Sequence, residues 1–469
     1  MRKRIALGVS IPAVILFLGL LIALLLPSNL LVVTEALDRL GWLGGRERID
    51  GLIQEPPGRR EAGPLVLLGG RLWDAQGGSR PNPGLCASGG RIQPCAERPA
   101  PDARIVDISG MTALPGLIDM HIHSLGGGFA GEMMIGNGVT SARDLGTQLA
   151  GVLRHRHETE EGSRLGPRLF VSGPYLVGGG GAGDQEIGVT SPEGAARLVE
   201  RFAQAGVDGI KVHTGIDAPT LRAVVAAARG RMGGDGRAPL WVAAHLDLVS
   251  AADAAAMGVS TIEHASGIDL GVGLAATRHQ DEAIAAMVAH GVALTPTVVV
   301  AEHAFTLPRL ARGEDPAQQF VPRFFRRFWI SSQIANAAAA HLTDEEAARR
   351  RGRLERLERF VARFHAAGGR VLAGTDAPAF LVAPGFDIHR ELELLAEAGL
   401  GAEAALKSAT SEAAAALGYP GELGGLSPGM RADIVVVAGD PFEGPGGIRT
   451  TRNVVLVVKD GRVMLDRLH

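Results

Sequence analysis

The hydrophobic and polar positions first mark out a segment at the start of the chain. An uncharged apolar run covers residues 5–26 and follows three basic residues, Arg2, Lys3 and Arg4. At about 1.5 Å per residue, the run makes a helix of roughly 33 Å, which spans a bilayer core of about 30 Å. We therefore expect an uncleaved transmembrane helix within an anchor at 1–29, its N-terminus in the cytoplasm, and a linker at 30–63. A cleaved signal peptide is the alternative, although no small-residue cleavage site follows the run.

Through the middle of the chain, short apolar segments alternate with helical stretches rich in Ala, Leu, Arg and Glu. The strand candidates are 114–121, 139–145, 167–173, 209–213, 241–245, 261–264, 293–298 and 371–376. Eight β-α units are typical of a TIM barrel, so we expect an α/β fold with a (β/α)8 barrel at 114–418. A charged helical insertion at about 303–360 separates the last two predicted strands, where a substrate loop is expected.

Further strand signals stand on both sides of this barrel. They lie at 65–68 and 103–107 before it, and at 432–437 and 453–458 after it. Short β-rich runs bounded by turn residues are typical of antiparallel sheets. Strands at both ends predict one small β-sandwich domain that combines 64–113 with 419–469.

Composition narrows the function classes. Of 469 residues, 46% are hydrophobic, which excludes a disordered chain, and the formal net charge is −3. That charge leaves no basic footprint, so no nucleic-acid partner is expected. The two cysteines, Cys86 and Cys95, flank a Ser-Gly-Gly-Arg turn and could lie diagonally across a hairpin. In an oxidising compartment they would form a disulfide, and two reduced thiols are the alternative.

Candidate metal ligands stand where the predicted strands end. His121 and His123 close the first strand, and residues two apart on a strand point the same way. His245, His264 and Asp376 close three others. A single histidine pair or strand-end aspartate is usually coincidence, packing or a helix cap. Because barrel strands all end at one face, the combination predicts a metal site there.

Lys211, on the fourth predicted strand, adds to this set. The chain has 47 basic residues, of which only Lys3, Lys211, Lys407 and Lys459 are lysines. Burial lowers the pKa of a lysine, and the neutral amine can add CO2 to form a carbamate that bridges two metal ions. Arginine cannot do this. A lysine paired with a buried acid is the ordinary alternative.

These residues resemble a known family. The segment 114–123, the segment 374–377 and the closing segments 424–428 and 432–435 look like motifs of the metal-dependent amidohydrolase superfamily. The resemblance covers about residues 64–467 and is closest to the imidazolonepropionase-like and prolidase-like branch, which includes binuclear dipeptidases. It implies a barrel with a β-sandwich, and it says little about the substrate.

The resemblance also implies a role for each ligand. His121, His123 and Asp376 would bind the more buried metal. His245 and His264 would bind the second, and carboxylated Lys211 would bridge the two. The implied cofactors are two divalent ions, zinc first. A hydroxide that bridges them would attack the scissile carbonyl, while Asp376 carries the proton to the leaving amine.

Other candidates are weaker. His213 lies two residues beyond Lys211, so we expect it to face the site and hold the substrate carbonyl, or to act behind a ligand. Tyr175 is expected to line the substrate pocket. We expect His303 at the surface, His389 packed on a helix, and Arg143-Asp144 as an internal structural pair.

The leading hypothesis is a membrane-anchored, periplasmic hydrolase of an amide, dipeptide or cyclic amide C–N bond, Xaa-Pro dipeptides included. Its partners would be that small molecule and the membrane, with a homo-oligomer left open. A lactonase or esterase that uses the same binuclear site is one alternative. A non-catalytic, metal-stabilised, membrane-tethered binding protein is the other.

Overall fold

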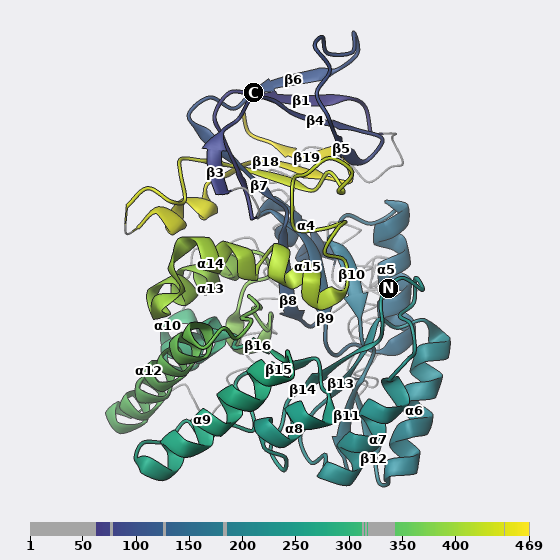
Figure 1. Cartoon of the computed structure of the whole chain (residues 1–469), viewed down its shortest axis with the longest axis vertical. Helices are drawn as coiled ribbons and strands as arrows, with labels where there is room; N and C mark the ends of the chain where they lie inside the picture. Colours follow the sequence, from purple (N-terminus) through teal and green to yellow (C-terminus); the bar gives the residue numbers. More distant parts are fainter. Residues whose placement is uncertain are drawn as a thin grey trace, which may run out of the picture.

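A computed structural model describes residues 62–468, apart from 76–77, 125–127, 182–184, 312–313, 315–316, 318–342 and 445. The predicted anchor at 1–29 and nearly all of the predicted linker at 30–63 lie outside the described residues. Within the described part, no helix is both long enough and apolar enough to cross a bilayer. Figure 1 shows sheets from both chain ends stacked above an α/β barrel.

The upper part contains two sheets that share one core. The first sheet has the order β5-β4-β1-β6, with β1 Leu65–Leu68, β4 Leu85–Ser88, β5 Arg91–Gln93 and β6 Arg104–Asp107. The second has the order β19-β18-β17-β7-β2-β3, with β2 Arg71–Asp74, β3 Gly78–Pro81, β7 Met111–Pro115, β17 Ile434–Ala438, β18 Val454–Lys459 and β19 Arg462–Asp466. Leu67, Ile92, Val436 and Leu456 meet in the core between them.

Strand β17 joins this sandwich to the barrel below. It pairs antiparallel with β7, with Leu114 opposite Val435, so the two chain ends share one sheet. Ile434 and Val436 pack in the sandwich core, whereas Val435 and Val437 pack in the barrel core. Successive side chains of a strand point to opposite faces, and both faces of β17 are covered. This explains its uninterrupted apolar sequence.

The cysteines lie on the β4–β5 hairpin. Ser88 pairs with Arg91 across a two-residue turn whose glycines, Gly89 and Gly90, have φ of 57° and 78°. Left-handed backbone at both turn positions matches the twist of the strands and favours glycine. Cys86 pairs with Gln93, so Cys95 lies diagonally across the hairpin. The structure joins Cys86 and Cys95 in a disulfide, which the sequence left open.

The lower part is a TIM-barrel-like domain of parallel strands. One group has the order β10-β9-β8, with β8 Leu117–Ile122, β9 Val139–Asp144 and β10 Arg168–Val171. The other has the order β12-β11-β13-β14-β15-β16, with β11 Tyr175–Gly178, β12 Glu186–Val189, β13 Gly209–Val212, β14 Trp241–Ala244, β15 Thr261–Glu263 and β16 Ala293–Thr295. Asp208 N donates to Val171 O, which connects the two groups.

The eighth predicted strand, 371–376, closes the ring without being a regular strand. Val371 forms an isolated parallel bridge with Leu294 on β16, and Ala377 forms one with Ile122 on β8. Between these bridges, Met120 N donates to Ala373 O. The segment therefore fills the eighth place of the barrel and presents Asp376 at its end.

The first predicted strand, 114–121, is in fact parts of two strands. Leu114 and Pro115 belong to β7 of the sandwich, and β8 of the barrel begins at Leu117. The break falls at Gly116, where an added Cβ would lie 2.1 Å from Thr140 Oγ1. Both strands are buried on both faces, so the hydrophobic pattern runs through the break and conceals it. The sandwich strand thus extends two residues past the predicted boundary.

Helices cover the barrel. They are α4 Gly128–Gly136, α5 Leu149–Glu161, α6 Pro192–Ala205, α7 Ala218–Ala228, α8 Ala251–Met257, α9 Leu274–Ala289, α10 Val298–Ala311, α12 Asp344–Ala366, α13 Asp387–Leu395, α14 Gly401–Ser408 and α15 Ser411–Leu417, with short helices η4 Ala379–Leu381, η5 Ala396–Leu400 and η6 Gly447–Arg452. Local sequence sets several ends. Before α6, Ser191 Oγ accepts from Gly194 N, and Gly206 ends the helix with φ of 87°.

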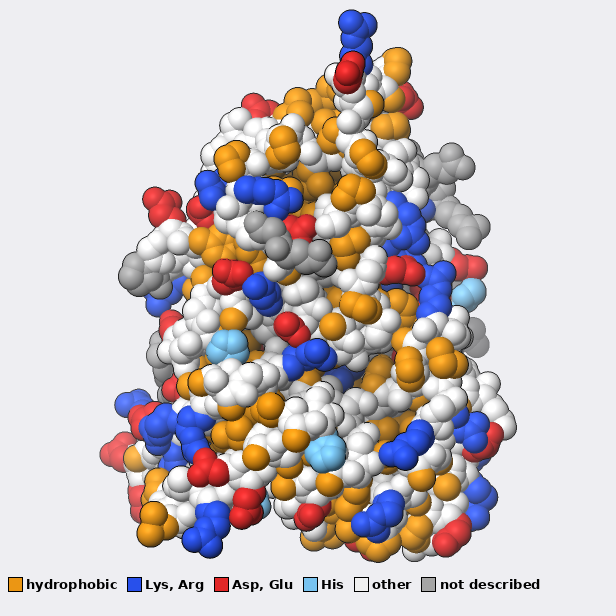
Figure 2. All heavy atoms as spheres, in the orientation of Figure 1, with side chains coloured by type: hydrophobic (Ala, Val, Ile, Leu, Met, Phe, Trp, Pro, Cys, Tyr) orange, Lys and Arg blue, Asp and Glu red, His pale blue; other side chains and the backbone are white. Residues whose placement is uncertain are grey.

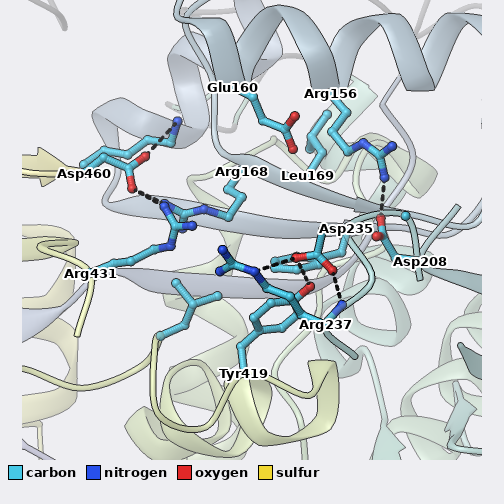
Figure 3. A pocket seen from close by; sticks show the side chains of 14 residues that line it. Arg156, Glu160, Arg168, Leu169, Asp208, Asp235, Arg237, Tyr419, Arg431 and Asp460 are labelled. Carbon is cyan, nitrogen blue, oxygen red and sulfur yellow. Dashed lines mark hydrogen bonds and ion pairs between the residues drawn. The ribbon is translucent and has the colours of Figure 1, made fainter. Parts of the chain in front are cut away.

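Charged residues bind the barrel to the sandwich at the N-terminal ends of the barrel strands. Arg168, the first residue of β10, donates to Asp433 Oδ2 at 2.7 Å and to Asp460 Oδ1 at 2.5 Å. Figure 3 shows Arg168 and Arg431 converging on Asp460, and Arg156 directed at Asp208. A cavity of about 420 Å³ lies among these residues. In barrels this end contributes to stability, whereas active sites occupy the other end.

Replacement of Arg168 by methionine should destabilise the protein. Asp433 would keep a buried carboxylate without its main cation, which costs about 3 kcal/mol of unfolding free energy. Urea denaturation of the parent and Arg168→Met measures the loss. Arg154→Met serves as the control, because Arg154 is 62% exposed and lies 4.0 Å from Glu158. The control should change stability by less than about 0.5 kcal/mol. Equal losses in both variants would contradict the role of Arg168.

Candidate metal centre

The strand ends of the barrel bring the predicted ligands together. His121 is on β8 and His123 follows that strand, while His245 follows β14 and His264 follows β15. The imidazole ring centroids of His121 and His264 are 4.7 Å apart, and those of His264 and His245 are 4.8 Å apart. Asp376 joins them from the closing segment. Residues far apart in sequence thus form one cluster at the C-terminal end of the barrel.

The carboxylate of Asp376 lies at the middle of this cluster. Its Oδ1 is 3.3 Å from His121 Nε2 and 3.0 Å from His123 Nε2, while its Oδ2 is 4.0 Å from His264 Nε2. Ligand atoms of His121, His264 and Asp376 all lie within 4.8 Å of one another. One oxygen thus faces the pair from β8 and the other faces β15, so the carboxylate can contact ions on both sides.

The backbone is strained at two of these residues. His264 has φ of 59° and Asp376 has φ of 57°, a left-handed conformation that non-glycine residues rarely adopt. Such strain is found where the surrounding structure fixes a functional side chain. Here His264 N donates to Thr295 O, and Asp376 N donates to His121 O. Hydrogen bonds to neighbouring strands therefore hold both residues in place.

Three buried polar atoms of the cluster have no hydrogen-bond partner among the described residues: His121 Nε2, His245 Nδ1 and Lys211 Nζ. Buried polar groups in proteins are nearly always hydrogen-bonded, because an unpaired one loses its hydration without compensation. A divalent ion binds to nitrogen lone pairs and to carboxylate oxygens, and this cluster brings both kinds of atom together. The residues present therefore fit a metal site.

The protonation states agree with metal binding. Burial lowers the pKa of His264 to about 4, and it lowers the pKa of His121 well below the ordinary value. Burial would raise the pKa of Asp376, but His121 and His123 hold that pKa well below its usual range. For His123, burial would lower the pKa, but the hydrogen bond to Asp376 raises it above its usual value. His121 and His264 thus offer neutral imidazoles and Asp376 offers an ionised carboxylate, the forms that coordinate metals.

Lys211 is buried on β13, with 1% of its surface exposed. Burial lowers the pKa of its amine to about 8, although Glu263 and Asp376 act in the opposite direction. A substantial fraction of the amine is then neutral near pH 8, and a neutral amine is the form that can react with CO2. The ordinary alternative, a hydrogen-bonded pair with a buried acid, is not found among the described residues.

Glu263 sets the proton position on His121, and the sequence analysis did not single it out. His121 Nδ1 lies 2.8 Å from Glu263 Oε2. Burial would raise the pKa of Glu263, but the charges of Arg143 and Lys211 hold it below its usual value. An ionised carboxylate only accepts, so Nδ1 donates to it and Nε2 keeps its lone pair. Glu263 was detectable, because it directly precedes His264 in the same strand-end motif.

Arg143 does not form the predicted internal pair with Asp144. Its Nη2 lies 2.8 Å from Glu263 Oε1, inside the barrel. Asp144 instead accepts from Ser124 N at 2.6 Å and from Gly146 N at 3.1 Å. The prediction was wrong because neighbouring residues of a strand point to opposite sides.

A second support acts on His264. Thr297 Oγ1 lies 2.7 Å from His264 Nδ1, which leaves Nε2 facing Asp376. Thr297 directly precedes α10, and the first two amides of that helix, Val298 N and Val299 N, donate to the buried carboxylate of Glu391. Glu391 comes from α13, far away in sequence, and no local sequence pattern predicts this contact.

The remaining candidates differ in their placement. The rings of His213 and Tyr175 are tilted by 33° with centroids 4.8 Å apart. The ring centroid of His213 is 4.2 Å from that of His245, so both side chains border the cluster. His303 is 6% exposed and lies 3.8 Å from Asp387, which contradicts the expectation of a surface residue. We expected exposure because His303 stands at the start of the predicted insertion, but there α10 packs against η4 and α13. His389 packs on α13 as expected.

A cavity of about 530 Å³ opens beside the cluster. His245, His264 and Asp376 line it, together with apolar side chains of α10 and residues of α12. A volume of this size accommodates a small organic molecule. The fold and this donor set at the strand ends together define a hydrolase.

The chain belongs to the amidohydrolase family, whose model matches residues 112–464. It is therefore a hydrolase that acts on carbon–nitrogen bonds, and the resemblance inferred from sequence is confirmed. On the face drawn in Figure 2, acidic and basic side chains are interspersed, without a large patch of one sign. Among curated proteins, none matches the chain.

Solved structures of prolidases and amidohydrolases share the fold. A Bifidobacterium longum protein assigned as a prolidase is 25% identical, with a TM-score of 0.67 over 86% of this chain and 95% of that one. Bottromycin amidohydrolase is 26% identical, with a TM-score of 0.66 over 90% of each chain. A Xaa-Pro dipeptidase with methionine in its active site is 21% identical, with a TM-score of 0.64 over 86% of this chain and 100% of that one.

Replacement of Glu263 by glutamine should weaken metal binding about 10- to 100-fold. Arg143 and Thr261 would hold the amide oxygen, as they hold Oε1 now. The amide nitrogen would then face His121 and donate to Nδ1, which moves the imidazole proton to Nε2 and blocks the lone pair.

Competition with a chelator measures the affinity, and circular dichroism checks the fold. Glu200→Gln is the control, because it also removes a carboxylate from an arginine pair, with Arg231, without touching a histidine. Equal metal affinities of the parent and Glu263→Gln would refute the role of Glu263.

Proposed function

We propose that the protein is a binuclear metallohydrolase that cleaves an amide bond of a small molecule such as a dipeptide, Xaa-Pro included, or a cyclic amide. The position of Asp376 supports this most strongly. One carboxylate oxygen lies near His121 and His123, and the other faces His264. The unpartnered amine of Lys211 belongs to the same cluster. A carboxylate and a second potential bridging group suit two ions better than one.

In this proposal His121, His123 and Asp376 hold the more buried ion, and His245 and His264 hold the second. Lys211, with CO2 added to its amine as a carbamate, would be the group that holds both ions. When bound, divalent ions would supply a water with its pKa lowered to about 7 and would polarise the scissile carbonyl. Imidazole and carboxylate donors favour zinc.

The chain's own residues move the proton and orient the substrate. Asp376 accepts the proton of the attacking water at a carboxylate oxygen and passes it to the leaving nitrogen, which cannot depart as an anion. Burial lowers the pKa of His213 to about 4, so its ring is neutral and can donate one hydrogen bond to the substrate carbonyl. Tyr175, whose ring packs on His213, keeps that ring in place.

We further propose that residues 1–29 anchor the protein in a membrane, with the N-terminus in the cytoplasm and the hydrolase domain in the periplasm. The basic residues before the apolar run support this orientation. The Cys86–Cys95 disulfide supports it independently, because disulfides persist in oxidising compartments.

Metal content tests the binuclear site. The parent, purified without chelator and with bicarbonate present, should contain about two divalent ions per chain. Lys211→Met keeps the length of the side chain and removes the amine, so it should lose metal and its dependence on bicarbonate. Lys407→Met is the control, since Lys407 pairs with Glu403 on α14. Elemental analysis gives the number of ions. One ion per chain in both parent and Lys211→Met would make Lys211 structural.

Turnover tests the reaction. Asp376→Asn removes the proton acceptor and a ligand charge, so hydrolysis should fall at least about 100-fold while the fold survives. A panel of dipeptides, acyl amino acids and cyclic amides, each beside its ester or lactone counterpart, measures activity and the bond preferred. Substantial activity of Asp376→Asn with metal present would count against this mechanism. Faster cleavage of the esters and lactones would favour the lactonase alternative.

A further inference from the structure

The cavity beside the metal cluster has two chemically different ends. His245, His264 and Asp376 line one end. The wall continues along α10 through Thr297, just before its first turn, and then Val300, Ala301 and Ala304. These positions recur at helical spacing, so they form one face of the helix. The cavity therefore runs along α10, away from the reacting end.

Two arginines of α12 stand at the far end. Arg350 and Arg353 line the cavity, and together with Asp376 they are its charged lining residues within the described part of the chain. Arg353 follows Arg350 by three residues and Leu357 follows it by seven, so the three side chains share one face of α12. Figure 1 shows α12 packed beside α10 at the edge of the barrel. An apolar channel thus leads from a metal cluster to a pair of cations.

The two arginines are held differently. Arg350 Nη1 donates to Ala304 O at 2.6 Å, and Nη2 donates to Glu346 at 2.6 Å, so its guanidinium is fixed between α10 and α12. Arg353 has neither a hydrogen bond nor an ion pair among the described residues. An unpaired cation at the end of an apolar channel suits an anionic group of a ligand. Arg350, whose own charge is paired with Glu346, holds α12 against α10 beside it.

The length of the channel indicates where that anion lies on the substrate. Thr297 contacts His264, and Ala304, which accepts from Arg350, lies six residues after Val298, where α10 begins. Six residues of helix span about 9 Å. One extended residue spans at most about 3.6 Å, so the α-carboxylate next to the cleaved bond of a dipeptide would fall short. A carboxylate on a longer acyl group or side chain would reach.

We propose that Arg353, supported by Arg350, binds a carboxylate of the substrate at the end of the channel, about 9 Å from the reacting carbonyl. The preferred substrates are then amides with an apolar middle and a distal carboxylate. This inference rests on the proposed amide hydrolysis, which it narrows to a substrate class.

Matched anilides test the proposal on the metal-loaded full chain. The probes are the 4-nitroanilides of suberic acid, with a distal carboxylate, of octanoic acid, without one, and of succinic acid, with a near carboxylate. Suberoyl anilide should exceed both others about tenfold in kcat/KM, since a hydrogen bond between charged groups contributes that factor. Arg353→Met should remove most of this preference, and Arg353→Lys should retain part of it.

Arg359→Met is the control. Arg359 is exposed, lies on the opposite face of α12 and is absent from the cavity lining, so its replacement should leave all three rates unchanged. A parent without preference for suberoyl anilide would overturn the proposal, and so would a preference that Arg353→Met leaves intact. An equal kcat/KM for succinoyl and suberoyl anilide would contradict the proposed distance between the bound carboxylate and the reacting carbonyl.

Binding of free suberate, measured by calorimetry, separates this inference from the proposed function. The parent should bind suberate about tenfold more tightly than Arg353→Met does. Raising the salt concentration should weaken binding to the parent, because salt screens the charges. If no anilide is cleaved but this difference is found, amide hydrolysis of these probes fails and the carboxylate site stands. Equal affinities in parent and variant would refute the site, whatever the anilides show.

Discussion

The buried pair of Arg143 and Glu263 is the constraint on which both the barrel and its chemistry depend. Their side chains are 1% and 0% exposed, and their closest atoms are 2.8 Å apart. Arg143, on β9, also donates to Met120 O on β8 and to Thr261 Oγ1 on β15, so one side chain connects three strands. The other oxygen of Glu263 orients His121. A buried charge pair is costly unless further hydrogen bonds satisfy its polar atoms, and here one of those donors, the Nδ1–H of His121, belongs to a proposed metal ligand. The same contact therefore stabilises the core and fixes the site.

The ligand cluster could be predicted from sequence because it follows from two simple periodicities. Residues two apart on a strand face the same side, and parallel strands of a barrel end at one face, so the strand-end His121, His245 and Asp376 had to meet. Their supports could not be predicted in the same way. Glu263 faces inward next to a proposed ligand, but its partner Arg143 lies 120 residues earlier in the sequence, on β9. Glu391 reaches the site by capping α10 from a helix that follows the insertion. Such contacts depend on tertiary packing, which no local pattern encodes.

The strand boundary at Gly116, which the sequence did not reveal, has a physical cause. The segment 114–121 is apolar enough to suggest one strand, yet the chain crosses from the sandwich to the barrel at Gly116. On β17, alternate residues pack into the two different cores. Where a strand is covered on both faces, hydrophobicity no longer reports which sheet it belongs to. The two domains therefore share strand β17, whose side chains belong to both cores. The first barrel strand, which carries His121, follows directly after β7, the sandwich strand that pairs with β17.

The proposed catalytic residues and the proposed substrate-binding residues lie on different elements, the first on strand ends and the second on helix α12. The proposed ligands lie at strand ends, where main-chain hydrogen bonds hold even the left-handed conformations of His264 and Asp376. Chemistry of this kind needs fixed geometry, since a misplaced ligand changes the charge and orientation of the reacting water. Arg350 and Arg353 lie instead on α12, within the insertion between β16 and the closing segment of the barrel. A helix outside the barrel can change in sequence without disturbing the core. It follows that the reaction is determined by the strands, while the choice of substrate can diverge through the insertion that faces the same cavity.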